Sequence, residues 1–155
     1  MEDVMKHARF AIIAIALSVP AAAQAATTDP EVIIYRFPGV RDDGSGVVTV
    51  FHCTNFSGAT ETLRFVTRRN DGFLLQNDTA TIPHLATVTA STQNAIAYSE
   101  TLILASGVVA QGTTAIAATS TSIICTAMTI DATITKVVGV ALRGVRFSPA
   151  PGSQE

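Results

Sequence analysis

The stretch LRFVTRRNDGFLL, residues 63–75, gives the clearest indication of the fold class. Its two apolar arms, Leu63-Arg64-Phe65-Val66 and Phe73-Leu74-Leu75, flank the tripeptide Asn70-Asp71-Gly72. Glycine adopts a positive φ without steric cost, and Asn and Asp tolerate tight turns, so this tripeptide is typical of a hairpin connection. The stretch therefore predicts two antiparallel β-strands.

The rest of the chain repeats this pattern. From Val32 onward, short apolar or alternating segments are separated by Gly, Pro, Asn, Asp and Ser, as in successive strands. The predicted strands are Val32–Phe37, Val47–Thr54, Thr62–Arg69, Phe73–Thr79, Ala86–Thr92, Thr113–Thr119, Ile123–Ile130 and Val138–Phe147. This spacing predicts an all-β fold, a single antiparallel β-sandwich of about eight strands.

Two segments indicate which strand faces are buried, and a third leaves two interpretations open. Ala86–Thr92 alternates apolar and polar residues, so one face packs inward and the other meets water. Ile123–Met128 is apolar on both faces and predicts a central strand, covered by the facing sheet and by loops. Within Gln93–Gly112, either one helical turn opens at Ser99-Glu100 or Ile96–Leu104 forms a further strand.

The first 25 residues have the layout of a secretory signal peptide. A basic start is followed by the apolar run Phe10–Val19, a proline and small residues that suit a signal peptidase. Cleavage would release a mature chain that begins at Ala26, and either Met1 or Met5 is the initiator. The run is shorter than the ~20 residues of a membrane-spanning helix.

The predicted organisation is therefore a cleaved signal peptide at 1–25, one β-sandwich domain at 26–147 and a flexible tail at 148–155. The predicted location is periplasmic or extracellular, with no stable membrane anchor after cleavage. The formal net charge of -2 gives no general attraction to phosphate backbones, so nucleic acid is not predicted as a partner.

Cys53 and Cys125 both lie in the exported part of the chain. An oxidising compartment favours their pairing, and the predicted bridge joins the two sheets of the sandwich. Two buried free thiols and a metal site are the alternative readings of these residues.

Three segments carry a resemblance that covers nearly the whole mature chain. They are Phe51-His52-Cys53-Thr54-Asn55-Phe56-Ser57, residues 118–128, and Val145-Arg146-Phe147-Ser148-Pro149. They resemble small exported bacterial β-sandwich proteins of uncharacterised function. A strand that ends in Asn, then an Asp-Gly hairpin and a Thr-rich strand, is also similar to immunoglobulin-like modules, which implies an immunoglobulin-like sandwich. Neither resemblance supplies catalytic residues.

The residue types of a blue-copper site are present as His52, His84, Cys125 and Met128. Their spacing argues against copper, because no histidine follows Cys125 and a disulfide would consume its thiolate. Gly44-Ser45-Gly46 lacks the strand-elbow-helix context of a hydrolase nucleophile, and the preceding Asp42-Asp43 is better explained by turn chemistry. No catalytic residue, metal or cofactor is therefore predicted.

A candidate partner surface comprises Phe56, Arg64 and Arg68. Phe56 follows a predicted strand and would serve as an aromatic anchor on a loop, or else cap the core beneath that loop. Arg64 and Arg68 share one face of their strand and would bind a carboxylate or phosphate, or else form a solvated face.

These observations favour a non-catalytic extracytoplasmic module that binds or scaffolds another macromolecule, an unknown protein or envelope component. A subunit or accessory of a bacterial surface structure is the second hypothesis, and a small enzyme is the third. The first hypothesis rests mainly on the chemistry that is missing from the sequence.

Overall fold

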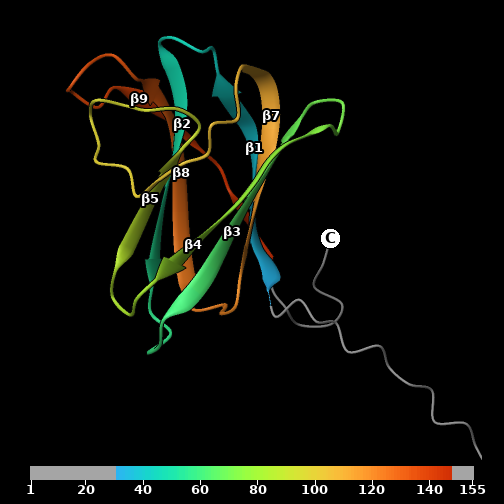
Figure 1. The fold of residues 1–155 in the computed structure, drawn as a ribbon, viewed down its shortest axis with the longest axis vertical. Coiled ribbons are helices and arrows are strands. Elements are labelled where there is room, and N and C mark those ends of the chain that lie inside the picture. Colours follow the sequence, from blue (N-terminus) through green and yellow to red (C-terminus); the bar gives the residue numbers. More distant parts are fainter. Residues whose placement is uncertain (1–30, 148–155) are drawn as a thin grey trace, which may run out of the picture.

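The computed structural model describes residues 31–147, which form ten strands (Figure 1). The strands are β1 (Val32–Asp42), β2 (Val47–Asn55), β3 (Glu61–Arg69), β4 (Leu74–Ile82), β5 (Thr87–Ser91), β6 (Leu102–Ile103), β7 (Val109–Ala118), β8 (Ile123–Asp131), β9 (Gly139–Leu142) and β10 (Val145–Arg146). The predicted signal peptide and tail lie outside the described residues. Within residues 31–147 there is no helix, and hence none that could cross a bilayer.

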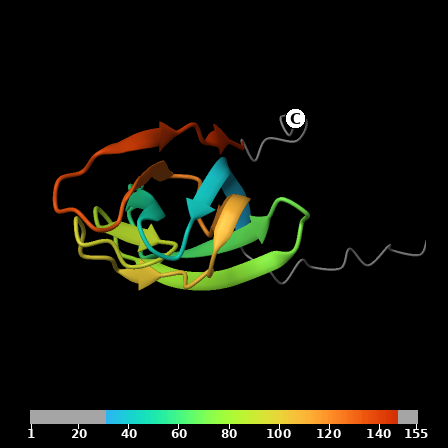
Figure 2. The ribbon, with the colours of Figure 1, turned by 90° about the horizontal axis from the view of Figure 1, so that it is seen from above.

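The strands form two sheets of five that share one core. One sheet has the order β10-β1-β7-β3-β4 and the other the order β6-β5-β2-β8-β9 (Figure 2). The predicted all-β class is confirmed, with ten strands where about eight were expected. The sheets are antiparallel except where β6 pairs with β5 in parallel, so a purely antiparallel arrangement is wrong at that edge.

β4 ends three residues later and β7 begins four residues earlier than predicted, and three other strand predictions differ more. The strand predicted to end at Phe37 continues to Asp42, because Gly39 adopts a φ of 80° and lets the chain pass through a register shift. The predicted strand Val138–Phe147 is two strands, β9 and β10, in different sheets. Of the two interpretations of Gln93–Gly112, the helical turn is wrong. The further strand is present only as the two-residue β6, and β7 begins at Val109.

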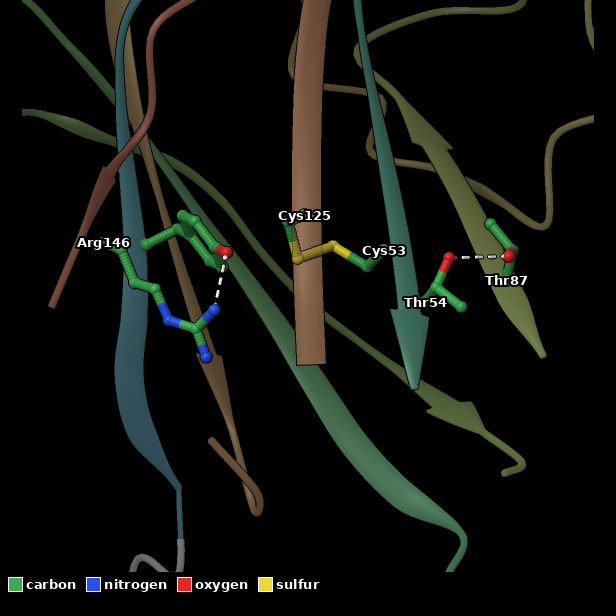
Figure 3. Close-up of a disulfide and its surroundings, with 6 residues drawn as sticks. Cys53, Thr54, Thr87, Cys125 and Arg146 are labelled. Atoms are coloured by element: carbon green, nitrogen blue, oxygen red, sulfur yellow. Dashed lines mark hydrogen bonds between the residues drawn. A yellow bond between two sulfur atoms is a disulfide. The ribbon is translucent and has the colours of Figure 1, made fainter. Parts of the chain in front are cut away.

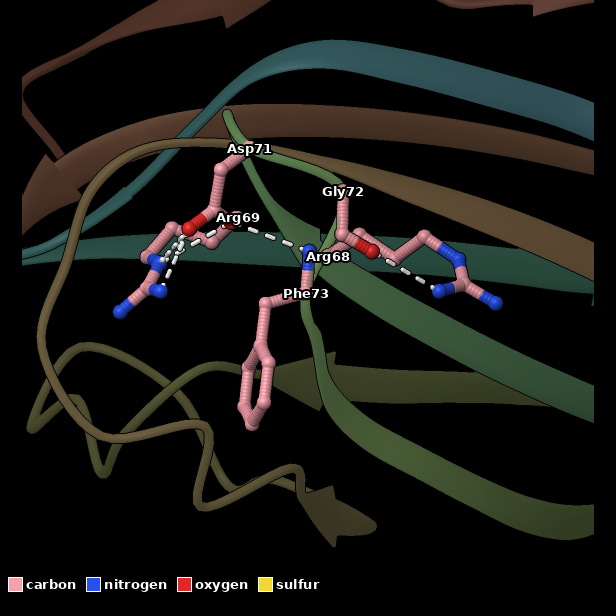
Figure 4. Close-up of polar contacts among 5 residues, drawn as sticks. All are labelled: Arg68, Arg69, Asp71, Gly72 and Phe73. Carbon is pink, nitrogen blue, oxygen red and sulfur yellow. Dashed lines mark hydrogen bonds and ion pairs between the residues drawn. The ribbon is translucent and has the colours of Figure 1, made fainter.

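The hairpin predicted from residues 63–75 is confirmed (Figure 4). Arg69 N donates to Phe73 O at 2.9 Å, and Gly72 N donates to Arg69 O at 2.9 Å. Gly72 has a φ of 85°, the conformation for which glycine was expected there. The Asp71 carboxylate accepts from Phe73 N at 3.0 Å and pairs with the Arg69 guanidinium.

Aromatic rings hold the two sheets together. Phe51 on β2 is fully buried and lies between Phe37 on β1 and Phe65 on β3, with ring centroids 5.7 and 6.0 Å away. Tyr35 stacks on Phe37 and extends the row. Aromatic pairs at this separation contribute about 0.5–1.5 kcal/mol each beyond the area that they bury.

A second apolar cluster covers the outer face of the β2–β8 sheet. Val48 and Val50 alternate with the inward-facing residues of β2 and pack beneath Ala95 and Tyr98 of the loop at residues 92–101. Met128 of β8 joins this cluster. The prediction that Ile123–Met128 is covered on both faces holds only at Met128, because Ile124 on the outer face is 50% exposed.

The Cys53–Cys125 disulfide is present and buried, but the prediction that it joins the two sheets is wrong. Cys53 on β2 and Cys125 on β8 are direct cross-strand partners within one sheet, with Cα atoms 4.1 Å apart (Figure 3). Hydrogen-bonded and non-hydrogen-bonded residue pairs alternate along an antiparallel ladder. Phe56 N donates to Ser122 O, so Cys53 and Cys125, three positions along, form a closely spaced pair without hydrogen bonds between them. Sequence separation does not distinguish neighbouring strands from facing ones.

Between β9 and β10 the chain crosses from one sheet to the other along one side of the sandwich (Figure 2). Gly144 lies in this crossing, against the buried ring of Phe37. A Cβ atom added at Gly144 would stand 2.7 Å from Cζ of Phe37, closer than carbon atoms can approach. The crossing therefore requires glycine for reasons of space.

We expect Gly144→Ala to lower the free energy of unfolding by about 1–3 kcal/mol, because the methyl group must displace the Phe37 ring from the aromatic row. Gly46→Ala is the matched control, since its added Cβ would lie 4.0 Å from the nearest atom, on Asp43. Urea unfolding followed by circular dichroism measures both. Equal stability of the two variants would show that the crossing has room for a side chain.

Candidate binding surface

Several loops gather at one end of the sandwich (Figure 1). The pairing of β2 with β5 and β8, and of β1 with β7, places the ends of β1, β5 and β8 beside the starts of β2, β7 and β9. The loops at residues 43–46, 92–101, 104–108 and 132–138 therefore meet there. Loops carried by a rigid sheet are common sites of binding.

The β1–β2 turn is fixed by Asp43. Its Oδ1 accepts hydrogen bonds from the backbone N–H groups of Val47, Ser45 and Gly46 at 2.8, 2.9 and 2.7 Å. These bonds, led by that from Val47, lower the pKa of Asp43 to about 2. Asp42 Oδ1 accepts from Gly44 N at 2.7 Å. The turn chemistry predicted for Asp42-Asp43 is confirmed.

Buried threonines anchor the neighbouring loop. Thr92 N donates to Thr49 O at 3.0 Å, and Thr49 N donates to Thr92 Oγ1 at 3.1 Å. The Thr49 hydroxyl in turn donates to Arg41 O at 2.9 Å. Because both threonines are buried, these bonds tie the start of the loop at residues 92–101 to β1 and β2.

Residues of this loop contribute to the lining of two cavities. The first, of about 380 Å³, has the amide side chains of Gln93 and Asn94 in its lining together with aliphatic Ile103 and Val108. The second, of about 450 Å³, is lined by Ile96, Thr133, Ile134, Thr135, Lys136 and Val138. Aliphatic side chains and polar side chains together line each of the two cavities.

Aliphatic side chains are exposed around both cavities. We call them the loop-end surface: Ile96, Val108, Ile134, Val137 and Val138. Val108 and Val138 are 65% and 66% exposed, although each belongs to a residue type that is usually buried. Lys136, the only lysine in residues 31–147, is the one charged residue among those that line the second cavity. The loop-end surface was not predicted from the sequence.

His52 and Tyr98 connect the loop at residues 92–101 to the β2 strand. The two rings are 4.8 Å apart in an edge arrangement, and His52 Nδ1 lies 3.1 Å from Thr89 Oγ1. Tyr98 OH donates to Met128 Sδ at 3.6 Å. Burial lowers the pKa of His52 below 6.5, because the charged imidazolium would lose solvation beneath the loop.

Phe56, the predicted aromatic anchor, lies in the loop after β2 at the opposite end of the sandwich from the loop-end surface. Its side chain is 50% exposed, so Phe56 is not a buried cap on the core. Phe56 N donates to Ser122 O at 2.9 Å, which holds the loop against the β7–β8 connection. The structure therefore leaves the ring accessible and does not bring it near the loop-end surface.

Arg64 and Arg68 lie on the outer face of β3, as their spacing predicted. Arg64 forms an ion pair with the nearly buried carboxylate of Glu31, so its charge is already matched. Arg68 is exposed, and its Nη1 donates to Gly72 O at 3.0 Å (Figure 4). The two arginines share a face, but Phe56 stands on a loop and is not part of it.

The residues weighed for copper have separate structural roles. His84 Nδ1 accepts from Gly58 N at 3.0 Å, Cys125 is in the disulfide, and His52 and Met128 pack beneath the loop at residues 92–101. Across residues 31–147, no three His, Cys, Asp or Glu side chains are grouped so that they could hold a metal ion.

Comparison with protein-family models, with curated proteins and with solved structures finds no match to this chain.

Because burial lowers the pKa of His52 in the folded chain, the free energy of unfolding should depend on pH. As pH falls below 6.5 the unfolded chain takes up a proton on His52 before the folded chain does, which favours unfolding. We expect the free energy of unfolding to be lower at pH 5.5 than at pH 7.5, and this difference to shrink in His52→Gln. Denaturant unfolding at both pH values measures it.

Thr54→Val is the control for this experiment, because it removes a side-chain hydrogen bond on the same strand without changing a titratable group, so the pH difference should stay as in the unsubstituted chain. A pH difference that persists unchanged in His52→Gln would contradict the assignment to His52.

Proposed function

We propose that this chain is a non-catalytic binding module that contacts a protein partner through the loop-end surface. The observation that carries the proposal is the exposure of Ile96, Val108, Ile134, Val137 and Val138 on loops around two cavities. Removing apolar surface from water contributes about 25 cal/mol per Å². Exposed aliphatic side chains grouped in this way mark sites of interaction.

The way these loops are held supports the same function. Thr49 and Thr92 fix one end of the loop at residues 92–101, and Tyr98 packs on His52 farther along. A loop that is already ordered loses less conformational entropy when a partner binds. The surface is therefore suited to a partner that docks without refolding the module.

An extracytoplasmic location fits the same proposal. The buried disulfide is the kind of bond that persists in oxidising compartments, and residues 1–25 have the pattern of a secretory signal peptide. The immunoglobulin-like arrangement also stays a prediction, and the two facing sheets support it. The disulfide within one sheet differs from antibody domains, in which the disulfide joins the two sheets.

A subunit of a bacterial surface structure is the second candidate. The observation that favours it is the long free edge of β4, since subunits that pair head to tail through such edges build polymers. The number of copies of the chain that associate in solution distinguishes a subunit that polymerises from a discrete binding module.

Capture of a partner by the immobilised exported chain from a solubilised native envelope fraction tests the proposal. We expect a discrete protein to be retained by the unsubstituted chain, and its retention to fall about tenfold or more with Val138→Asp, which places a charge in the apolar contact. Phe56→Ala and the double variant Arg64→Ala/Arg68→Ala should retain the protein fully.

Full retention by Val138→Asp, or loss with Phe56→Ala, would place the contact elsewhere and contradict the loop-end assignment. Circular dichroism of each variant shows whether the fold is intact. Failure of the unsubstituted chain to retain any discrete protein would contradict the proposed function.

A further inference from the structure

β4 is the longest of the strands at the sheet edges within the described residues. It has nine residues, whereas the edge strands β6, β9 and β10 have two, four and two. Only one residue of β4, Asp78, is charged. A long edge with little charge presents a row of unpaired backbone groups to another strand, and soluble proteins usually protect such edges.

The hydrogen-bond pattern shows which groups of β4 are free. Asn70 N donates to Gln111 O and Thr119 N donates to Thr62 O, so the even-numbered residues of β3 bond to β7. The odd-numbered residues of β3 therefore bond to β4, through the partners Gln76, Asp78, Ala80 and Ile82. The backbone groups of Asn77, Thr79 and Thr81 consequently point away from the sheet.

These three residues make the edge self-complementary. If two copies pair antiparallel with a twofold axis at Thr79, then Thr79 faces Thr79 of the other copy and Asn77 faces Thr81. Threonine pairs across strands are favourable. Asp78 would face Ala80 rather than a second carboxylate, so no like charges oppose each other.

Exposed apolar residues lie at both ends of the same edge. Phe73 is 61% exposed and Leu85 is 66% exposed, and each lies six residues from Thr79 along the chain. The Phe73 side chain extends away from Asp71 and Arg68 at the hairpin (Figure 4). Phe73 directly precedes β4 and Leu85 lies in the turn that follows it, so the two side chains flank the paired edges of such a dimer.

The conformation of Leu85 supports this arrangement. Leu85 has a φ of 61°, a left-handed conformation that costs a residue with a side chain about 1–2 kcal/mol. Its backbone is fixed, because Leu85 N donates to Asn55 O at 2.8 Å. A large aliphatic side chain is thus held exposed at a strained position, as occurs where a contact depends on it.

We propose that β4 is a dimerisation edge at which two copies of this chain pair antiparallel about a twofold axis at Thr79. The pairing joins one sheet of each copy into a continuous sheet of ten strands. It uses β4 once per copy, so it closes at two copies. Because strand pairing alone forms a small interface, the dimer has a dissociation constant in the micromolar range.

Sedimentation velocity of the exported chain across a concentration series tests this edge. We expect a monomer–dimer equilibrium, and a rise of at least about tenfold in the dissociation constant with Thr79→Pro, which removes an outward N–H and leaves the β3–β4 ladder intact. Thr79→Val keeps that N–H and the branched shape, so it should dimerise as the unsubstituted chain does.

Leu85→Asp provides a second variant outside the strand, and we expect it also to weaken the dimer. Monomer at every concentration would overturn the proposal, as would a dimer that neither Thr79→Pro nor Leu85→Asp weakens. An open-ended series of oligomers would also overturn it and would favour the surface-structure subunit. Urea unfolding of each variant shows that the monomer is folded.

Discussion

The contact of Phe51 with Phe37 and Phe65 is the interaction on which the rest of the structure depends. Phe51 comes from one sheet and its two neighbours from the other, so the row sets the position of the sheets relative to each other. The crossing at Gly144 passes directly over the Phe37 ring and is possible only because position 144 has no side chain. The disulfide joins strands that are already hydrogen-bonded, and it stabilises mainly by closing a loop across a sequence separation of 72 residues.

The parts of the fold that local chemistry determines could be predicted from the sequence. The hairpin at Asn70-Asp71-Gly72 is one, because the turn residues and the flanking apolar arms act within a few positions. The split of the last strand was not predictable, since it depends on which sheet each half meets. The prediction that Cys53 and Cys125 lie in different sheets was wrong for the same reason. Both cysteines face the core, and the alternation of side chains along a strand does not show which strands are neighbours.

Of the candidate surfaces, the sequence indicated the exposure of Phe56 and the shared face of Arg64 and Arg68, but not the loop-end surface. Ile96 and Val108 lie in the segment that had two interpretations, and Val138 was assigned to a strand, where an aliphatic residue is expected to be buried. Their exposure results from the meeting of separate loops at one end. The proposed partner contact and the proposed pairing edge are carried by different residues, those of the loop-end surface and those of β4.

Urea unfolding of Phe51→Ala with the Cys53–Cys125 bridge intact measures how far the two sheets depend on the aromatic row. The substitution removes the ring between Phe37 and Phe65 and leaves a cavity between the sheets. We expect a loss of about 3–5 kcal/mol in the free energy of unfolding, as for other buried phenylalanines. A loss below about 1 kcal/mol would show that the sheets cohere without the aromatic row and would contradict the dependence of the fold on Phe51.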